Sequence, residues 1–175
     1  MSEEEEFSMG DWNRSTSKMR LDEIQPAVWS AIQEHFETYD LKPDLRDYLM
    51  CIKTISSKKK KRLFGGGLPN QTTQTVIITP MWLVLAAQGD KPDSPGVLSV
   101  QLKDAIAKDY KDDPGYKLIP DTGVNVTGLF TGRVGMHGSS HITSFIAFGE
   151  EPAAGEFKEL LFETIANAKK EKPSD

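Results

Sequence analysis

Between Thr75 and Ala87 the chain carries two apolar, largely β-branched segments and no charged residue. The segments meet at Thr79-Pro80, and proline has no N–H with which to bond a neighbouring strand. Pro80 therefore suits a turn or the first residue of a strand, and not the middle of a central strand. The pattern predicts a buried β-hairpin, in which strand, tight turn and strand follow one another.

The composition is that of an ordinary globular protein. The 175 residues suffice for one domain with its own core, and the 38% hydrophobic and 27% charged residues are typical of that class. The net charge of −5 argues against nucleic acid as a partner, because phosphate binding needs a basic excess. No uncharged apolar stretch reaches the ~20 residues of a membrane helix. Since the single cysteine, Cys51, excludes an internal disulfide and residues 1–19 do not resemble a secretory signal, we expect a cytoplasmic protein.

Two segments have helical periodicity. Apolar residues recur every four positions from Ile24 to Phe36, which predicts an N-terminal helix over about residues 22–39. A second apolar face predicts a C-terminal helix over about residues 153–170. The residues of this second face are Phe157, Leu160, Leu161, Thr164 and Ile165.

The start of the chain has little to bury. Residues 1–18 are acidic and then rich in serine and threonine, so we expect a disordered arm in which only Trp12 is suited to dock. A single domain over residues 19–175 would follow this arm.

Short apolar or alternating segments predict further strands besides the hairpin. They are residues 48–56, 97–102, 123–130 and 141–148. The order is then helix, six or seven short strands, and helix. Such an order favours an α+β fold that is mostly antiparallel, with a bent sheet or small barrel capped by the C-terminal helix and an extra N-terminal helix.

This chain resembles the pleckstrin-homology-like and GRAM-like domains over about residues 48–170. Thr75–Thr79 and Leu83–Leu85 are similar to the apolar strand, threonine turn and leucine-rich strand of that family, and Leu102–Ile106 is similar to its short following turn. The family also ends in one amphipathic helix. The resemblance implies a pleckstrin-homology-like fold with a binding function and little catalysis, although a fold alone does not determine function.

Five consecutive basic residues form the clearest candidate site. They are Lys58, Lys59, Lys60, Lys61 and Arg62. Basic residues near a membrane surface attract anionic headgroups by ~1 kcal/mol each. Pleckstrin-homology domains that bind phosphoinositides carry similar residues around their first inter-strand loop, and Lys60-x-Arg62-x-Phe64 resembles their pattern. Gly65 departs from it, because a second apolar residue is expected there. The alternative is a solvated edge strand whose lysines prevent aggregation.

The histidines give a weaker signal. His137 and His141 have a spacing that suits zinc on a helix, but the glycines and serines around them disfavour a helix. A hydrolase could use this loop only if an acid oriented the histidine, and none is placed to do so. We expect no metal or cofactor. We also expect His35 to lie on the surface of its helix and Cys51 to be a buried, inert thiol.

The residues therefore favour a non-enzymatic binding module for an anionic lipid headgroup or a peptide. The alternative is a scaffold, in which the N-terminal helix with Trp29 and the hairpin edge pack against a second copy or another protein. The hydrolase that uses His137 and His141 is a third, more distant hypothesis.

Overall fold

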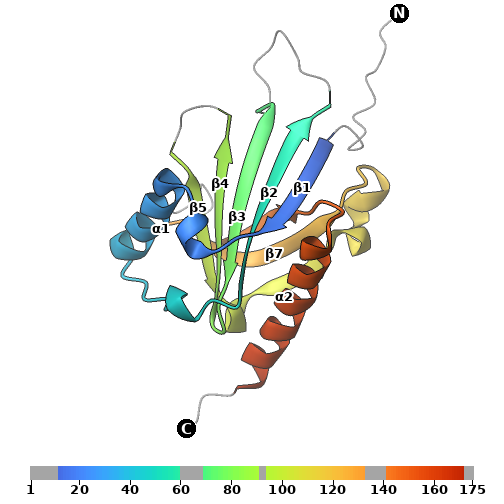
Figure 1. Cartoon of the computed structure of the whole chain (residues 1–175). Coiled ribbons are helices and arrows are strands. Elements are labelled where there is room, and N and C mark those ends of the chain that lie inside the picture. The colour runs from blue at the N-terminus through green and yellow to red at the C-terminus, as the bar shows by residue number, and fades with distance from the viewer. Residues whose placement is uncertain (1–11, 60–68, 91–93, 133–140, 172–175) are drawn as a thin grey trace, which may run out of the picture.

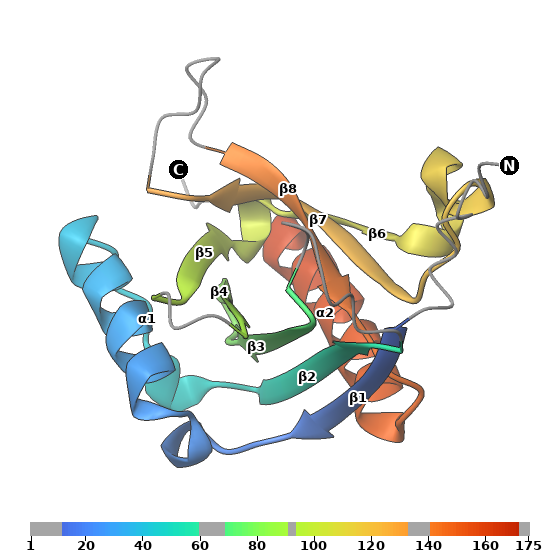
Figure 2. The ribbon, with the colours of Figure 1, turned by 90° about the horizontal axis from the view of Figure 1, so that it is seen from above.

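Eight antiparallel strands curl into a half-barrel, with one helix against its outer face and one against its inner face (Figures 1 and 2). The computed structural model describes residues 12–59, 69–90, 94–132 and 141–171. The strands are β1 (Trp12–Lys18), β2 (Met50–Lys58), β3 (Gln71–Ile78), β4 (Trp82–Gly89), β5 (Gly96–Gln101), β6 (Ile106–Asp109), β7 (Gly123–Phe130) and β8 (His141–Ala147). The helices are α1 (Pro26–Thr38) and α2 (Pro152–Lys170). Short 3-10 turns lie at Leu21–Glu23, Leu45–Asp47, Leu102–Asp104, Tyr110–Asp112 and Pro114–Lys117.

The sheet follows the order β1-β2-β3-β4-β5-β7-β6, and β8 pairs with the other edge of β7. The first five strands are neighbours both in sequence and in space. After β5 the chain bends through Leu102–Asp104, so that β5 meets β7 at one residue pair and β6 continues the pairing with β7. Figure 2 shows the consequence, because β6, β7 and β8 face β1, β2 and β3 across the half-barrel.

The hairpin of β3 and β4 is buried on both faces, which explains its unbroken apolar sequence. Val76 and Leu85 are paired neighbours that point into the half-barrel, where they join the larger core. Ile77 and Val84, one position along each strand, point to the other side and join the core beneath α1. Successive side chains of a strand alternate between faces, so a strand covered on both sides needs apolar residues at every position.

The turn between these strands is closed by one side chain. The Thr79 hydroxyl accepts hydrogen bonds from the N–H groups of Met81 (3.2 Å) and Trp82 (2.9 Å). Thr79 N–H also donates to the Trp82 carbonyl at 2.9 Å. Pro80 lies exposed in this turn, outside both strands. The predicted strand, turn and strand are therefore confirmed.

Helix α1 covers the outer face of the sheet. Pro26 begins it, a position at which the missing N–H of proline is not needed. Its buried residues Val28, Ile32 and Phe36 follow the expected four-residue spacing and share a core with Cys51 and neighbouring strand residues. The predicted helix is confirmed, although it is shorter than residues 22–39 because the first turn is the separate Leu21–Glu23 segment.

Helix α2 covers the inner side of the half-barrel. Phe157 and Leu161 are completely buried and Ile165 is nearly so, and all three belong to the larger core. The predicted C-terminal helix is confirmed, with bounds within a residue of those expected.

The expectation of a disordered arm over residues 1–18 is wrong for its last seven residues, while residues 1–11 lie outside the described part of the chain. Trp12–Lys18 forms β1, which pairs along its length with β2. Only Thr16 in this strand is buried, so composition carried little sign of order. Strand β6, with four residues, was also not anticipated.

Replacing Leu161 by alanine should lower the free energy of unfolding by about 2–5 kcal/mol, because it leaves a cavity where a large side chain was buried. Denaturant unfolding followed by circular dichroism measures the change. The matched control is Glu159→Ala, an exposed position on the same helix. Equal losses for both variants would show that α2 does not pack into the half-barrel.

Candidate functional site

The basic run begins where β2 ends. Lys58 is the last residue of β2, and the register of the sheet places it opposite Trp12, the first residue of β1. The Lys58 ammonium lies 5.6 Å from the centre of the Trp12 ring, a cation–π distance. Lys59 follows and is exposed. Lys60, Lys61 and Arg62 lie outside the described residues.

A polar cleft of about 660 Å³ lies beside this strand end. It is formed by the start of β1, the segment before β7 and the segment between β8 and α2. The residues that line it are Trp12, Asn13, Arg14, Lys59, Tyr116, Pro120, Asp121, Thr122, Phe148, Gly149, Glu150 and Glu151.

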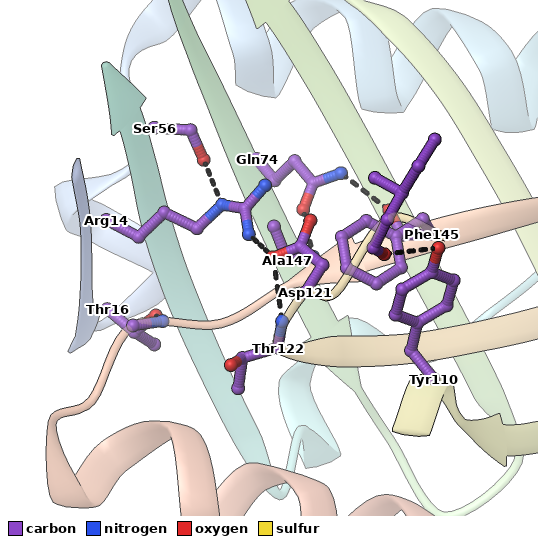
Figure 3. Close-up of polar contacts among 11 residues, drawn as sticks. Arg14, Thr16, Ser56, Gln74, Tyr110, Asp121, Thr122, Phe145 and Ala147 are labelled. Carbon is purple, nitrogen blue, oxygen red and sulfur yellow. Dashed lines mark hydrogen bonds and ion pairs between the residues drawn. The ribbon is translucent and has the colours of Figure 1, made fainter. Parts of the chain in front are cut away.

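An ion pair between Arg14 and Asp121 lies at the base of this cleft (Figure 3). The side chains are 12% and 3% exposed, and burial lowers the pKa of the Arg14 guanidinium from its ordinary value. Arg14 also donates to the Ser56 hydroxyl at 3.1 Å and lies over the Phe145 ring, 5.7 Å from its centre. The Oδ1 atom of Asp121 accepts from Thr122 N–H at 2.7 Å. Its Oδ2 atom is buried and, among the described residues, has no hydrogen-bond partner.

Side chains close the open side of the half-barrel here. The Gln74 amide, from the inner face of β3, donates to the Phe145 carbonyl at 2.8 Å and accepts from Ala147 N–H at 2.9 Å (Figure 3). Near the end of β8, Gly149 N–H donates to the Thr16 hydroxyl at 2.8 Å. Gln74 thus occupies backbone groups on the edge of β8 that a further strand would otherwise bond.

The charges decide where an anion can lie. Among the described residues that line the cleft, three carboxylates, from Asp121, Glu150 and Glu151, stand against two cations, Arg14 and Lys59. Arg14 is already paired with Asp121. The interior of the cleft is therefore unfavourable for an anion, and its rim at Lys58 and Lys59 is the favourable place.

Large apolar side chains are exposed on the same rim. Tyr116 lines the cleft with Lys59, and Leu118 and Ile119 follow before Pro120, another lining residue. Leu118 is 83% exposed, and Tyr116 and Ile119 are exposed as well. The segment is held in place because the Tyr110 hydroxyl donates to the Ile119 carbonyl at 3.0 Å. This corner of the molecule therefore combines lysines, aromatic rings and exposed aliphatic groups.

The histidines are placed differently from the expectation. His141 is exposed at the start of β8, whereas His137 lies outside the described residues. His35, expected on the surface, is buried, and its Nε2 atom lies 2.9 Å from the Ser99 hydroxyl. The helical period placed Phe36 in the core but could not show that His35 turns toward β5. Within the described ranges, no group of His, Cys, Asp and Glu side chains could hold a metal ion.

Sequence reasoning missed the ion pair. Arg14 and Asp121 are 107 residues apart, and neither has a recognisable motif around it. The only signal was Trp12, two residues before Arg14, which was expected to dock although the segment around it was expected to be disordered.

Comparison with known proteins gives no further guide: no protein-family model, no curated protein and no solved structure matches this chain. The resemblance to pleckstrin-homology-like domains is thus not confirmed. Among the described residues, neither helix has the length and apolar character needed to cross a membrane.

Replacing Arg14 by methionine should destabilise the protein by about 3–5 kcal/mol, because the buried Asp121 carboxylate loses its counter-ion. Denaturant unfolding measures the loss. The control is Arg46→Met, which breaks the exposed pair with Asp44 and should leave stability nearly unchanged. Adding Asp121→Leu to Arg14→Met should recover much of the loss. Equal losses of stability for Arg14→Met and Arg46→Met would show that burial of the Arg14–Asp121 pair does not determine its contribution to stability.

Cys51 should not react with thiol reagents in the native state. It is 1% exposed, and burial raises the pKa of its thiol to about 12, so the reactive thiolate is scarce at mildly alkaline pH. The rate of labelling by a chromogenic disulfide reagent tests this, with Ser17→Cys, an exposed position on β1, as the reactive control. Labelling of native Cys51 as fast as of Cys51 in denaturant would contradict the burial.

Proposed function

We propose that this chain is a non-enzymatic binding module of pleckstrin-homology-like type that binds anionic lipid headgroups at a membrane surface. The observation that carries the proposal is the corner at which Lys58 lies over the Trp12 ring and Trp12 shares a cleft with Tyr116 and Pro120, the ends of the segment that exposes Leu118. It makes the basic run part of a composite surface and not an isolated charged loop.

Each component of this surface has a role at a membrane. Tryptophan and tyrosine favour the headgroup region, because their rings are apolar and carry one polar group. An exposed leucine gains free energy when it enters the acyl boundary. Lysines add ~1 kcal/mol each near an anionic leaflet. The five residues Lys58 to Arg62 would provide attraction, while Trp12 and Leu118 would provide contact with the bilayer.

The acidic balance of the chain limits the strength of this binding. With a net charge of −5, the rest of the surface is repelled by an anionic membrane. We therefore propose a protein of the cytoplasm that associates with a membrane transiently and in a salt-sensitive manner.

Flotation with vesicles tests the proposal. Wild-type protein should float with vesicles of phosphatidylcholine and phosphatidylserine at low salt, and less so as salt shortens the Debye length to below ~10 Å. Lys60→Gln with Arg62→Gln should abolish flotation, because two of the five positive charges of the basic run are lost. A melting curve of the same variant checks that it is folded. The control is Lys169→Gln with Lys170→Gln, which removes the same charge from the end of α2. Failure of the wild type to float at low salt would contradict the proposal.

A specific observation favours a scaffold as the second candidate. An apolar groove of about 920 Å³ lies along α1, between the helix and the segment 42–46. Trp29 and Phe36 form part of its wall, together with Leu21, Ile24 and Leu45. In this alternative the groove receives a peptide or a second copy of the chain. Measurement of mass in solution by light scattering distinguishes a dimer from a monomer, with Trp29→Ala as the variant that should weaken any such dimer.

A further inference from the structure

Another pocket, of about 370 Å³, lies at the opposite end of the strands from the basic run. Strands β2 and β4 both pair antiparallel with β3 and so run in the same direction. Trp82, which lines the pocket, begins β4, whereas Lys58 ends β2 at the far end of the sheet (Figure 1). Its size is within the range of small-molecule sites. The lining residues are Tyr39, Leu41, Trp82, Ser99, Val100, Gln101, Asp104, Gly128, Phe130 and His141.

Aromatic rings from four parts of the chain meet around this pocket. Tyr39 follows α1, Trp82 begins β4, Phe130 ends β7 and His141 begins β8. The Tyr39 and Phe130 rings are perpendicular, with centres 5.1 Å apart, and the Phe130 and His141 ring centres are 6.0 Å apart. Rings at such angles present faces in different directions, as a cage around a rounded group requires.

A buried histidine holds the Tyr39 and Phe130 rings in place. The buried His35 ring packs edge-on against Tyr39, at 5.3 Å between centres, and lies 6.0 Å from Phe130. The Ser99 hydroxyl fixes His35 at 2.9 Å. Burial lowers the pKa of His35 and so disfavours the charged form of the ring, which would repel a cation. A preorganised site loses less entropy on binding than a mobile one.

Glycine at position 132 allows the close approach of Tyr39. Its φ angle is +73°, which favours glycine, and a Cβ atom there would lie 2.2 Å from the Tyr39 ring. The backbone therefore packs directly against this ring of the cage.

The electrostatics of the pocket favour a positive charge. Among the described residues that line the pocket, Asp104 is the one carboxylate and none is a lysine or an arginine. Tyr39 is also the C-cap of α1, so the negative end of the helix dipole lies at the pocket. Aromatic faces attract cations through their quadrupoles, most strongly when the cation is desolvated.

We propose that this pocket binds a small quaternary or methylated ammonium ligand, with the aromatic rings around its methyl groups and Asp104 opposite its charge. Such a group is round, apolar on its surface and positively charged. The pocket offers rings at several angles, aromatic surfaces and one carboxylate, and these suit the three features of the ligand in turn. Because the pocket lies at the opposite end of the strands from the basic run, the ligand is a free small molecule and not the headgroup of a membrane bound there. The site is independent of the membrane proposal.

The test compares choline with 3,3-dimethylbutan-1-ol, which has the same shape but no charge. Titration of the full chain, followed by NMR of the tryptophan indole signals, should shift the Trp82 signal, with choline bound about tenfold more tightly than the neutral alcohol. Glycerophosphocholine and trimethyllysine, as further arms, show whether a headgroup or a peptide side chain is accepted better. Binding of either more tightly than choline would overturn the assignment to a free small molecule.

Variants separate the contributions of charge and ring. Asp104→Asn should weaken choline binding about tenfold and leave binding of the neutral alcohol unchanged. Trp82→Leu should abolish binding of choline, while Trp29→Leu, the matched change in the groove along α1, should not. Since Asp104 is exposed, its variant is expected to fold even if the Trp82 variant does not. Equal affinity for choline and the alcohol, or no binding of choline at all, would overturn the proposal.

Discussion

Burial of both faces of the β3–β4 hairpin is the constraint on which the rest of the structure depends. Ile77 and Val84 must be covered on one side and Val76 and Leu85 on the other. Exposure of either set would cost roughly 1.5–3 kcal/mol for each side chain. Helix α1 covers the first set, and α2 with β7 and β8 covers the second. Curling of the sheet follows, because β7 and β8 must return over the inner face (Figure 2).

A sheet that curls only half-way leaves edges, and this protein joins them with polar side chains. Gln74 bonds the edge of β8, Thr16 bonds Gly149, and Arg14 reaches Asp121 from the opposite side. These groups would be costly to bury singly, so the pairs tie β1 and β3 to the far side of the half-barrel. The cleft beside the basic run is the space that this closure leaves, and its carboxylates direct anions toward the lysines at its rim.

The two proposed binding functions lie at opposite ends of the same strands. The end with Lys58 is basic and carries exposed aliphatic groups, whereas the end with Trp82 is aromatic and carries Asp104. A membrane at the first end would leave the second open to small molecules in solution. Each proposal can fail without the other, since no residue lines both sites.

The sequence alone determined the elements whose side chains alternate or repeat: the hairpin with its turn at Thr79, both helices and the other strands of at least six residues except β1. Local periodicity suffices there, because burial of one face leaves a visible pattern. Only the tertiary structure decided that Trp12–Lys18 is a strand, since backbone hydrogen bonds to β2 order it and its side chains are mostly exposed. The same holds for the pairing of Arg14 with Asp121, the burial of His35 against Ser99, and the cage of Tyr39, Trp82, Phe130 and His141. Such contacts join residues far apart in the chain, so no local spacing records them; the curvature of the sheet brings them together.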